Sequence, residues 1–508
     1  MPPLLVSMAG LAGVRERSPR LSRLWEGAML LSLLSALLSL VLLVLQGPRV
    51  CGLPGPGGGV LSMRLDAVSV TLSLLVSFIG WVVVRFASSY LEGENRRVLF
   101  MAHLCLTLVS VLVLVGAGSL FQVLGAWILT SLFLHRLLLF YPERSAARRA
   151  ARKKFITARI GDLALAGAVW ALLSAYGTAD IGEILVAARA GVGGAGAVGA
   201  SVLLALAAIL KSAQFPTHGW LTEVMDTPTP VSAILHAGVV NAGGFLLIRF
   251  ADVLLLSPGT LALLVVAGGV TALFGSLVML TQPTVKNSLA WSTVAQMGFM
   301  ILECGLAVFP VALLHIVAHS LYKAHSFLAS GGAVERVAAA GRPGPVAIPN
   351  ARAVARAFLA ALAIYAGVGA SFGLQHEAPQ TIALGAILIF GTAYLLAQGF
   401  AGAAPGGLTR RTALYALAAS VSYFSLQTLA GLATAGLLPA PPPPGPLQWA
   451  LITALVFGFG AIAIVQAMFP HWAHHPAAFG LRVHLANGFY ANALFNRLIG
   501  GWSLSNRS

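Results

Sequence analysis

The segment KSAQFPTHGWLTEVMDTPTPVSAILHAGVVNAGG, residues 211–244, determines the fold of this chain more than any other stretch. Lys211 ends one apolar run, three prolines follow it, and a second apolar run then carries His236. Proline removes a backbone donor and clashes with the preceding helical turn, so we predict an interrupted helix here. Interrupted membrane helices free backbone groups that line a hydrated cavity, which is a common setting for ion sites.

The composition of the whole chain indicates a membrane protein. Of the 508 residues, 58% are hydrophobic and only 9% are charged, and the mean hydropathy is +0.88. That leaves too little polar surface to cover a soluble globule of this size. The formal net charge is +16, but the arginines alternate with apolar runs instead of forming one basic face, which argues against a nucleic-acid partner.

Apolar runs of the roughly 20 residues that a helix needs to cross a bilayer recur along the chain. Fourteen candidates lie near residues 24–46, 66–90, 98–118, 119–141, 155–177, 195–215, 229–250, 260–282, 287–308, 310–331, 353–373, 379–401, 412–437 and 446–469. We therefore expect an all-α, polytopic membrane protein of about fourteen transmembrane helices.

The distribution of arginine predicts the orientation. If the N-terminus is cytoplasmic, alternation places the basic segments on the cytoplasmic side, namely 96–97, 144–154, 336–352, 410–411 and 482–497. The acidic loop with Asp180 and Glu183 and the proline-rich loop 439–446 then fall outside. This arrangement satisfies the positive-inside rule and predicts that both termini are cytoplasmic.

The last 39 residues, 470–508, are too broken to span a membrane. Within them, HLANGFYANALFNRLIGGW carries apolar residues at roughly helical spacing. An amphipathic helix that lies on the membrane or docks a partner is one interpretation, and a solvated, frayed tail is the other.

Lysine is rare, with five residues against twenty-six arginines, and only Lys211, Lys286 and Lys323 follow Lys154. Each lies in or beside an apolar run, where an ammonium is costly, so function is the first hypothesis. Lys211 could instead extend to the headgroups, and Lys286, which follows a proline at the start of a run, could anchor a helix end. Glu223 and Asp226 are close enough in sequence to pair with Lys211.

The stretch HIVAHSLYKAHSF places His315, His319 and Lys323 four residues apart. At about 100° per residue they drift by only some 40° per step, so they form one polar stripe on a helix. Such a stripe suits proton transfer, because histidine accepts and donates protons near neutral pH; histidines hydrogen-bonded in helix packing are the alternative. Glu303 and Asp162, two acids in or near apolar runs, are further candidates for a proton site or an ion pair.

No metal site is predicted. The stripe has no carboxylate or cysteine at ligand spacing beside it. The three cysteines, Cys51, Cys105 and Cys304, are scattered and form neither a disulfide framework nor a metal-binding motif.

Taken in order, KSAQFPTHGWL, PTPVSAILHA, VKNSLAWSTVAQMGFM and HIVAHSLYKAHSFLASG resemble the core of the antiporter-like membrane subunits of respiratory complex I and of multisubunit cation/proton antiporters. The resemblance implies two inverted repeats, each with a broken helix, in which protons move along buried lysines and histidines. By matching position, Lys211 resembles the central channel lysine and His236 the relay histidine of the next helix. His315, His319 and Lys323 resemble the later relay.

Two departures from that pattern stand out. The family has a glutamate after the tryptophan of a Gly-Trp-Glu motif, as partner of the central lysine, and Ile128 occupies that position here. The family also carries a charge in the broken helix of its second repeat, whereas TIALGAILIFGTAYLLAQGFAG has none. With HAGVVNAGGFLLIRF and the ending HLANGFYANALFNRLIGGW, these features are similar to the DabB family, the membrane subunits of the DAB inorganic-carbon accumulation complexes.

This second resemblance covers nearly the whole chain. It implies a subunit of the bacterial inner membrane, in contact with lipid, that passes protons or sodium ions and works with a cytoplasmic, zinc-containing, carbonic-anhydrase-like DabA partner. An ion gradient would drive the partner's conversion of CO2 to bicarbonate, so the zinc and the catalysis belong to the partner. We accordingly expect no catalytic residue, cofactor or metal in this chain.

The resemblance also divides the chain into four parts: N-terminal helices (1–154), the antiporter-like core (155–335), second-repeat and C-terminal helices (336–469) and the cytoplasmic tail (470–508). The expected ion pathway comprises Lys211, His236, His315, His319, Lys323, Lys286 and Glu303, with Glu223, Asp226 and Asp162 as pairing acids. One alternative is a proton-pumping or antiporter subunit of a complex I, membrane hydrogenase or cation/proton antiporter assembly. Another is a purely structural membrane anchor.

Overall fold

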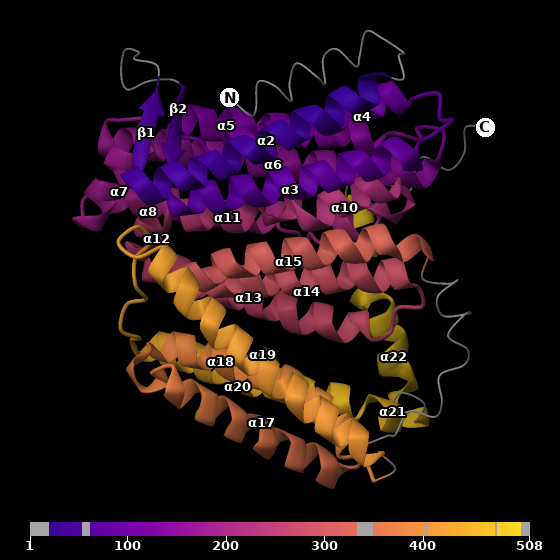
Figure 1. Ribbon diagram of the computed structural model, residues 1–508. Helices are drawn as coiled ribbons and strands as arrows, with labels where there is room; N and C mark the ends of the chain where they lie inside the picture. The colour runs from indigo at the N-terminus through magenta and orange to yellow at the C-terminus, as the bar shows by residue number, and fades with distance from the viewer. Residues whose placement is uncertain (1–19, 53–60, 333–348, 403, 473–474, 499–508) are drawn as a thin grey trace.

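The computed structural model describes residues 20–52, 61–332, 349–402, 404–472 and 475–498. Figure 1 shows long helices lying side by side, with a single short hairpin of strands at one end. Residues 336–348 of the predicted basic segment 336–352 lie outside the described residues.

The N-terminal part is a set of long helices. They are α2 (Arg20–Gln46), α3 (Ala67–Tyr90), α4 (Arg97–Val115), α5 (Leu120–Leu138) and α6 (Ser145–Tyr176). An antiparallel pair, β1 (Arg49–Gly52) and β2 (Ser62–Leu65), joins α2 to α3. Asp66 caps α3, since its carboxylate accepts the amide of Ser69 at 2.8 Å, and this fixes where the helix begins.

The central part contains the interrupted segment. Its elements are α7 (Ile181–Arg189), α8 (Gly194–Lys211), α9 (Gly219–Thr222), η1 (Val224–Asp226), α10 (Thr229–Ala237), η2 (Val239–Asn241), α11 (Ala242–Arg249), α12 (Ala251–Leu255), α13 (Pro258–Met279), α14 (Val285–Gly305), α15 (Phe309–Ala329) and η3 (Ser330–Gly332).

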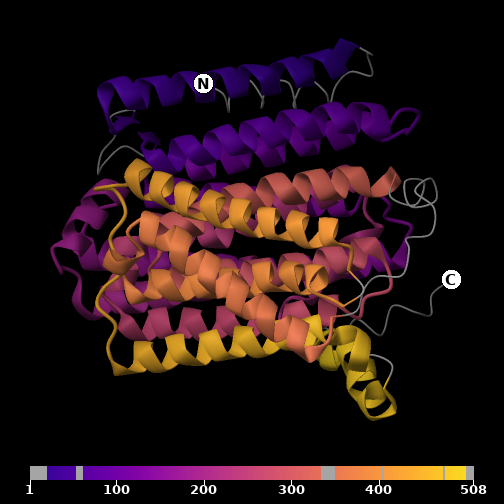
Figure 2. The same ribbon diagram turned by 60° about the horizontal axis from the view of Figure 1, so that its bottom comes forward.

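The last part begins with α17 (Ala351–Ser371), η4 (Leu374–His376), α18 (Pro379–Gly399), α19 (Gly406–Ala433) and α20 (Pro446–Ala467). The tail follows with α21 (Phe469–Trp472), η5 (Pro476–Ala478), α22 (Phe479–Ala486), η6 (Gly488–Tyr490) and α23 (Ala491–Leu498). Figure 2 shows α2 along one edge of the bundle and the tail at the opposite edge, near one end of the helices.

The predicted fold class is confirmed. Within the described residues, twelve helices are long and apolar enough to cross a membrane. α14 and α15, with 21 residues each, have a spanning length of about 30 Å but carry the polar residues of the predicted pathway. Together these helices correspond to the fourteen runs predicted from the sequence.

The helix is interrupted where the prolines predicted it. α8 ends at Lys211, and a regular helix of more than four residues resumes only at Thr229, where Pro230 occupies the first turn of α10. Proline is well placed there because its missing N–H is not needed in the first turn. A second interruption, at η2, separates α10 from α11. By contrast, α18, where a second broken helix is typical of the resembled family, runs without a break from Pro379 to Gly399.

One boundary differs from the prediction. α6 begins at Ser145 and continues for 32 residues, so residue 155, where a membrane span was predicted to begin, lies inside this helix. Lys153 and Lys154 are consequently part of a long helix, and both are buried. The arginine-rich composition of the segment indicated a loop, but alanines at 146, 147, 150 and 151 favour a helix and bury one face of it.

The basic connections share one end of the bundle. The guanidinium of Arg96 donates to the carbonyl of Phe140 at 3.2 Å, Lys153 donates to Asn492 of the tail, and a ring nitrogen of His471 contacts the carbonyl of Pro349 at 3.0 Å. The acidic loop lies at the other end, next to the strands and α12 (Figure 1). Charge is therefore segregated along the helices as the sequence predicted.

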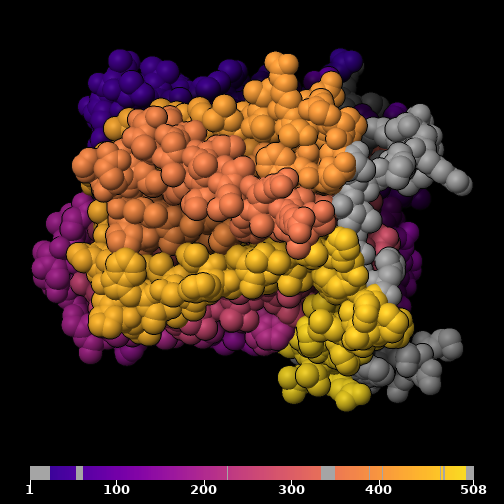
Figure 3. All heavy atoms as spheres, turned by 90° about the horizontal axis from the view of Figure 1, so that it is seen from below, coloured from indigo at the N-terminus to yellow at the C-terminus, as the bar shows by residue number. Residues whose placement is uncertain are grey.

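Close helix packing holds the centre together. A Cβ on Gly268 of α13 would lie 2.5 Å from the amide nitrogen of Leu302, and one on Gly298 of α14 would lie 2.5 Å from the amide nitrogen of Ala272. Only glycine allows two helix backbones to approach so closely, as in other membrane helix pairs. α14 is thereby fixed against α13. Figure 3 shows α17, α19 and α20 on the face of the molecule that is seen from below.

Candidate functional site

Lys211 is buried at the end of α8. Its ammonium lies 4.4 Å from the centre of the Trp127 ring of α5, which provides a cation–π contact. Within the described residues its Nζ has no hydrogen-bond partner. Lys211 therefore does not extend to the headgroups: it ends inside the protein, at the point where the helix is interrupted.

Asp162 of α6 is the acid that acts on Lys211. The two charges interact directly, and Trp127 also hydrogen-bonds Asp162. The carboxylate is 2.6 Å from the guanidinium of Arg159, one turn earlier on the same helix. The resembled family places its acid on α5, where this chain has Ile128, so here the negative charge beside the central lysine comes from the next helix.

Lys154 adds a second buried cation to this group. Its Nζ donates to the backbone oxygen and the hydroxyl of Ser131 at 2.6 and 2.8 Å, and its charge interacts with those of Lys211 and Asp162. One carboxylate thus faces three cations, Lys154, Arg159 and Lys211. The site therefore carries more buried positive charge than negative charge.

Of the other two predicted pairing acids, Glu223 lies elsewhere. Its Oε1 is 2.7 Å from the ammonium of Lys153 and accepts hydrogen bonds from Asn492 and Asn496 of the tail. The chain reverses between Lys211 and α9, so closeness in sequence does not bring Glu223 to Lys211. Asp226 ends η1, and its side chain lies outside the described residues.

His236 and His319 come together from two helices. The Nδ1 of His236 is 3.1 Å from the hydroxyl of Thr293, and its ring stacks on Phe327 with centroids 4.4 Å apart. The Nε2 of His319 donates to the backbone oxygen of His236 at 3.1 Å. The predicted relay residues of α10 and α15 are therefore in contact, and both are buried.

The stripe on α15 continues in both directions from His319. The ring of His315 lies 5.9 Å from that of His319, and its Nδ1 is 2.9 Å from the carboxylate of Glu303 on α14. In the other direction, the ammonium of Lys323 donates to the backbone oxygen of Leu289 at 3.0 Å and to the hydroxyl of Ser292. Glu303, His315, His319 and Lys323 thus follow one another along α15 and its contact with α14, and we call them the line.

Lys286 does not join this line. It lies in the first turn of α14 and is half-buried. Among the described residues it has no ion pair or side-chain hydrogen bond. Its place is that of a helix-end residue, the alternative considered for it from the sequence.

A large cavity opens beside the stripe. It has a volume of about 770 Å³, and α13, α14 and α15 form one wall while α18, α19 and α20 form the other. The first wall contributes Glu303, His315, His319 and Lys323, and the second contributes only neutral groups, among them Tyr394, Tyr423 and Gln466. The titratable line therefore borders a space that is large and polar enough to hold water.

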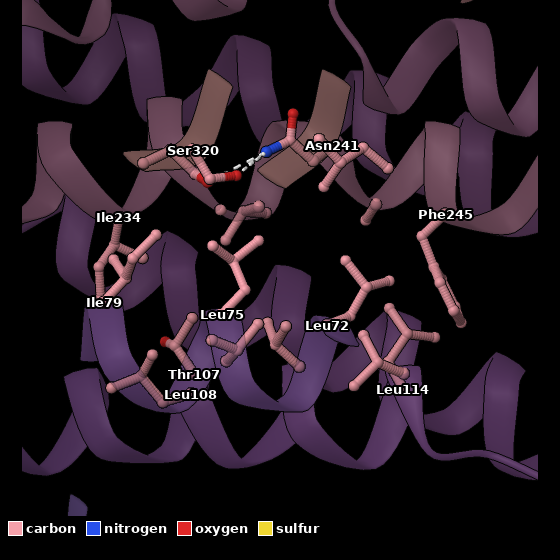
Figure 4. Close-up of a pocket in the computed structure, with 18 residues that line it drawn as sticks. Leu72, Leu75, Ile79, Thr107, Leu108, Leu114, Ile234, Asn241, Phe245 and Ser320 are labelled. Carbon is pink, nitrogen blue, oxygen red and sulfur yellow. Dashed lines mark hydrogen bonds between the residues drawn. The ribbon is translucent and has the colours of Figure 1, made fainter. Parts of the chain in front are cut away.

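A second cavity is apolar and borders α15 at Ile316 and Ser320, neither of which lines the large cavity (Figure 4). It has a volume of about 50 Å³ and is lined by aliphatic side chains of α3 and α4, such as Leu72, Leu75 and Leu108. Its polar edge is a hydrogen bond of 2.9 Å from the Asn241 amide to the hydroxyl of Ser320. With too few polar partners for water, this side of α15 insulates the stripe from the N-terminal helices.

The sequence did not single out Lys153, Lys154 or His218. The two lysines follow a run of arginines and resemble loop charges. Lysine is rare in this chain, however, and its use at these positions could have indicated a specific role. His218 is buried in the loop after α8, between the rings of Phe274 and Trp291 at 5.7 and 4.9 Å. Its neighbouring prolines gave no sign that the loop was interior.

The arrangement brings together groups that can move protons. Lysine, histidine and carboxylate side chains each bind one proton reversibly, and neighbours within hydrogen-bond reach can exchange it. The groups form two segments, one around Lys211 and one from His236 to Lys323. Between the two segments, Ser212 at the end of α8 donates to the Val240 carbonyl at 2.8 Å. Among the described residues, no group of three His, Cys, Asp or Glu residues could hold a metal ion.

Family models match two parts of the chain. Residues 117–341 match the family "NADH:quinone oxidoreductase/Mrp antiporter, TM", and residues 60–101 match "NADH-Ubiquinone oxidoreductase (complex I), chain 5 N-terminus". The first match contains every group of the line described above.

Two relatives extend the similarity. The chain is 41% identical over 338 residues to "Probable inorganic carbon transporter subunit DabB" of Hydrogenovibrio crunogenus, which covers 66% of this chain and 63% of that protein. It is 37% identical over 456 residues to "Probable inorganic carbon transporter subunit DabB2" of Halothiobacillus neapolitanus, covering 86% of this chain and 80% of that one. The alignment with the first thus spans slightly less than two thirds of its length.

A solved structure shares the fold. The "Structure of Mrp complex from Dietzia sp. DQ12-45-1b" matches 100% of this chain and 60% of the matched chain, with a TM-score of 0.62 and 23% identity. At that identity the likeness concerns the arrangement of helices alone.

Proposed function

We propose that this chain, which belongs to the DabB family of inorganic carbon transporter subunits, is an ion-translocating membrane subunit that couples an ion gradient to inorganic-carbon uptake. The observation that carries the proposal is the line of buried titratable groups from Lys211 and Asp162 through His236, His315 and His319 to Lys323. Burying so many ionisable groups in a membrane protein is costly, so a transport function is the first explanation for their presence.

The proton is the ion that suits this line. Its members are lysines, histidines and carboxylates, which each bind and release a proton, and Glu303 with His315 at 2.9 Å is one exchange pair. A sodium site would need several oxygen ligands around one point, as other hard cations do. The lysine ammonium groups in the line would repel a sodium ion at those positions.

The partner and the chemistry follow from the family. We infer a cytoplasmic, zinc-containing DabA-like subunit that hydrates CO2 to bicarbonate and a proton, with its zinc supplying the activated hydroxide. The present chain would then bind no zinc and carry out no catalysis. Its Arg-rich end would face the cytoplasm of a bacterial inner membrane, in agreement with the positive-inside rule, so the tail would lie on the partner's side.

Coupling requires the ion to favour one of two conformations. The interruption between Lys211 and Thr229 is suited to this role, because the loop places Lys211 at one of its ends and Glu223, which contacts the tail, near the other. A change in the protonation of Lys211 would therefore be transmitted through this loop to the Arg-rich end of the bundle, where we place the partner.

The test is to purify the tagged chain from its native membrane in mild detergent, identify the proteins that accompany it and assay zinc. The proposal predicts one large soluble partner in stoichiometric amount, with about one zinc per complex if it resembles a single-site zinc hydratase. Quinone-reductase, hydrogenase or antiporter subunits in its place would contradict the carbon-uptake function and favour a complex I or antiporter role.

A second arm tests transport in that complex. Lys211→Ala is expected to abolish gradient-driven inorganic-carbon uptake while the complex still assembles. Normal uptake by this variant would indicate a structural anchor without an ion pathway.

A further inference from the structure

Glu223 is held in an unusual way for a carboxylate at the end of a membrane helix bundle. Its Oε1 receives three donors: the ammonium of Lys153 at 2.7 Å, and the amides of Asn492 and Asn496 at 2.7 and 3.0 Å. Among the described residues no donor reaches its Oε2. The side chain of Glu223 is 26% exposed, whereas that of Lys153 is fully buried.

The tail is seated closely enough to provide these contacts in a fixed geometry. At Gly488 the backbone has a φ of +55°, and an added Cβ would lie 3.1 Å from the Trp291 ring. Position 488 therefore requires glycine. A Cβ on Gly219 would in turn overlap the amide of Asn492, so α9 and α23 lie in direct contact at the point where Glu223 follows α9.

A polar cavity lies between this carboxylate and the protein interior. It has a volume of about 200 Å³ and is lined by Glu223, Asn492, Gln282, Asn287 and, on its inner side, His218. His218 is completely buried, and within the described residues neither of its ring nitrogens has a hydrogen-bond partner. An unpartnered histidine at the wall of a polar cavity is a proton-binding group.

We propose that Glu223 and His218 form the proton-transfer site at the Arg-rich end of the chain, with Asn492 and Asn496 of the tail positioning the Glu223 carboxylate. Oε1 stays with its three donors, and Oε2 accepts a proton from the cavity or releases one to bulk water. The proton passes between Oε2 and a ring nitrogen of His218 through water in the cavity. The net change is one proton moved, with no covalent bond formed between heavy atoms.

The site links the ion route to the tail. The chain from His218 back to Lys211 is seven residues of the interrupted segment, so the transfer site adjoins the buried lysine through one loop. Because two of the three donors to Oε1 belong to the tail, displacement of α23 would leave the carboxylate with Lys153 alone. This proposal rests on the ion-translocating function proposed above and adds its entry or exit group.

The experiment measures proton uptake by proteoliposomes that contain the purified complex of the full-length chain, with an imposed membrane potential and a pH-sensitive dye in the lumen. Glu223→Gln is expected to lower the uptake rate about 100-fold, the scale of a positioned proton acceptor. Glu223→Asp is expected to restore much of it. Glu92→Gln is the matched control: Glu92 is an exposed acid in the turn between α3 and α4, and uptake should be unchanged.

A purely structural role for Glu223 makes a different prediction. In that case Glu223→Gln would fail because Lys153 is left buried without its partner, and the double variant Lys153→Met with Glu223→Gln would recover. We expect the double variant to assemble normally and to remain slow. Recovery of uptake in the double variant, or normal uptake by Glu223→Gln itself, would overturn the proposal.

The role of the tail is tested separately with the double variant Asn492→Leu and Asn496→Leu. This variant should assemble normally and take up protons more slowly than the wild type. Uptake at the wild-type rate would show that the tail is not part of the site.

The variant Lys211→Ala in the same assay distinguishes the transfer-site proposal from the ion-translocating function. If Lys211→Ala blocks uptake and Glu223→Gln does not, only the transfer site is wrong. If Lys211→Ala leaves uptake intact, the ion-translocating function itself is contradicted.

Discussion

The two walls of the large cavity differ in chemistry, although both consist of membrane-length helices. α14 and α15 bring Glu303, two histidines and Lys323 to it, whereas α18 and α20 contain no charged residue. In the resembled family both repeats carry a charge in a broken helix, and here α18 is continuous. One half of this bundle therefore carries the titratable groups, and the other half supplies a neutral, polar wall.

The physical reason is that buried charge needs partners. The first half supplies them: Asp162 for Lys211, Glu303 for His315, and a backbone carbonyl with a hydroxyl for Lys323. The second half has tyrosine and glutamine side chains, which orient water but do not hold a net charge. The continuous α18 agrees with a neutral second half, because a helix that binds no ion does not need an interruption to free backbone groups.

After Lys211→Ala, the largest effect is expected from removing a titratable group of the α15 stripe. His319→Ala or Lys323→Met should lower proton uptake by proteoliposomes about 1,000-fold, because no neighbouring group can pass the proton across the gap. Tyr394→Phe, on the facing wall of the same cavity, is the matched control and should keep most of the rate. Equal losses in all three variants would mean that the two walls do not differ in function.

A large effect on stability, but not on transport chemistry, is expected at the pair of Arg249 and Asp66. The guanidinium Nη1 lies 2.6 Å from the carboxylate of Asp66, and Nη2 donates to the hydroxyl of Ser69 at 2.6 Å. Arg249→Met leaves a buried carboxylate and should destabilise the chain by about 3 kcal/mol. Thermal unfolding of the detergent-solubilised complex measures this, and Asp66→Asn with Arg249→Met should recover most of the loss.

The pH dependence of that pair has a definite sign. Burial alone would raise the pKa of Asp66, but Arg249, the Ser69 amide and Arg64 together outweigh burial and hold the pKa well below its usual range. The pair therefore stabilises the wild type above the ordinary carboxyl pKa, and this contribution is lost as the pH falls toward the depressed value. In Arg249→Met, Arg64 and the Ser69 amide still contact Asp66, so the pKa of Asp66 should be less depressed and the stability lost on acidification should be smaller than in the wild type; parallel pH profiles would contradict this assignment.

A smaller effect is expected at Asp162. Asp162→Asn removes the one carboxylate beside Lys154, Arg159 and Lys211, and a change in the proton affinity of Lys211 should slow uptake roughly tenfold. Because Ile128 is adjacent to Trp127, which contacts Lys211, Ile128→Glu in the same chain should recover part of the rate. Failure of Ile128→Glu to help, with assembly intact, would show that a carboxylate on α5 cannot replace the one on α6.

The smallest effect is expected at Lys286. It is half-buried in the first turn of α14 and outside the line, so Lys286→Met should change uptake by less than about twofold. The same assay measures it. A loss comparable to that of Lys323→Met would place Lys286 in the pathway.

Much of this molecule follows from local sequence. Long apolar runs predicted the helices, three prolines predicted the interruption after Lys211, and four-residue spacing predicted the stripe on α15. These patterns depend on helix geometry and proline chemistry, which act within a few residues.

Other features depend on contacts between distant residues. Lys153 appeared to belong to a basic loop, but it is buried in a longer helix and meets Asn492, 339 residues away. Glu223 appeared to be a partner for Lys211, but the reversal of the chain brings it to Lys153 and the tail instead. His218 lies in a loop whose burial is imposed by Phe274 and Trp291 of two later helices. Such contacts leave no periodic pattern in the sequence.

Proton uptake by proteoliposomes that contain the complex, compared between wild type and Lys211→Ala at equal amounts of assembled protein, tests the ion pathway most directly. Loss of uptake in Lys211→Ala, with the same composition of the complex and the same zinc content, is the predicted result. Uptake at the wild-type rate would show that ions do not pass the buried lysine, and the line of titratable groups would then be structural.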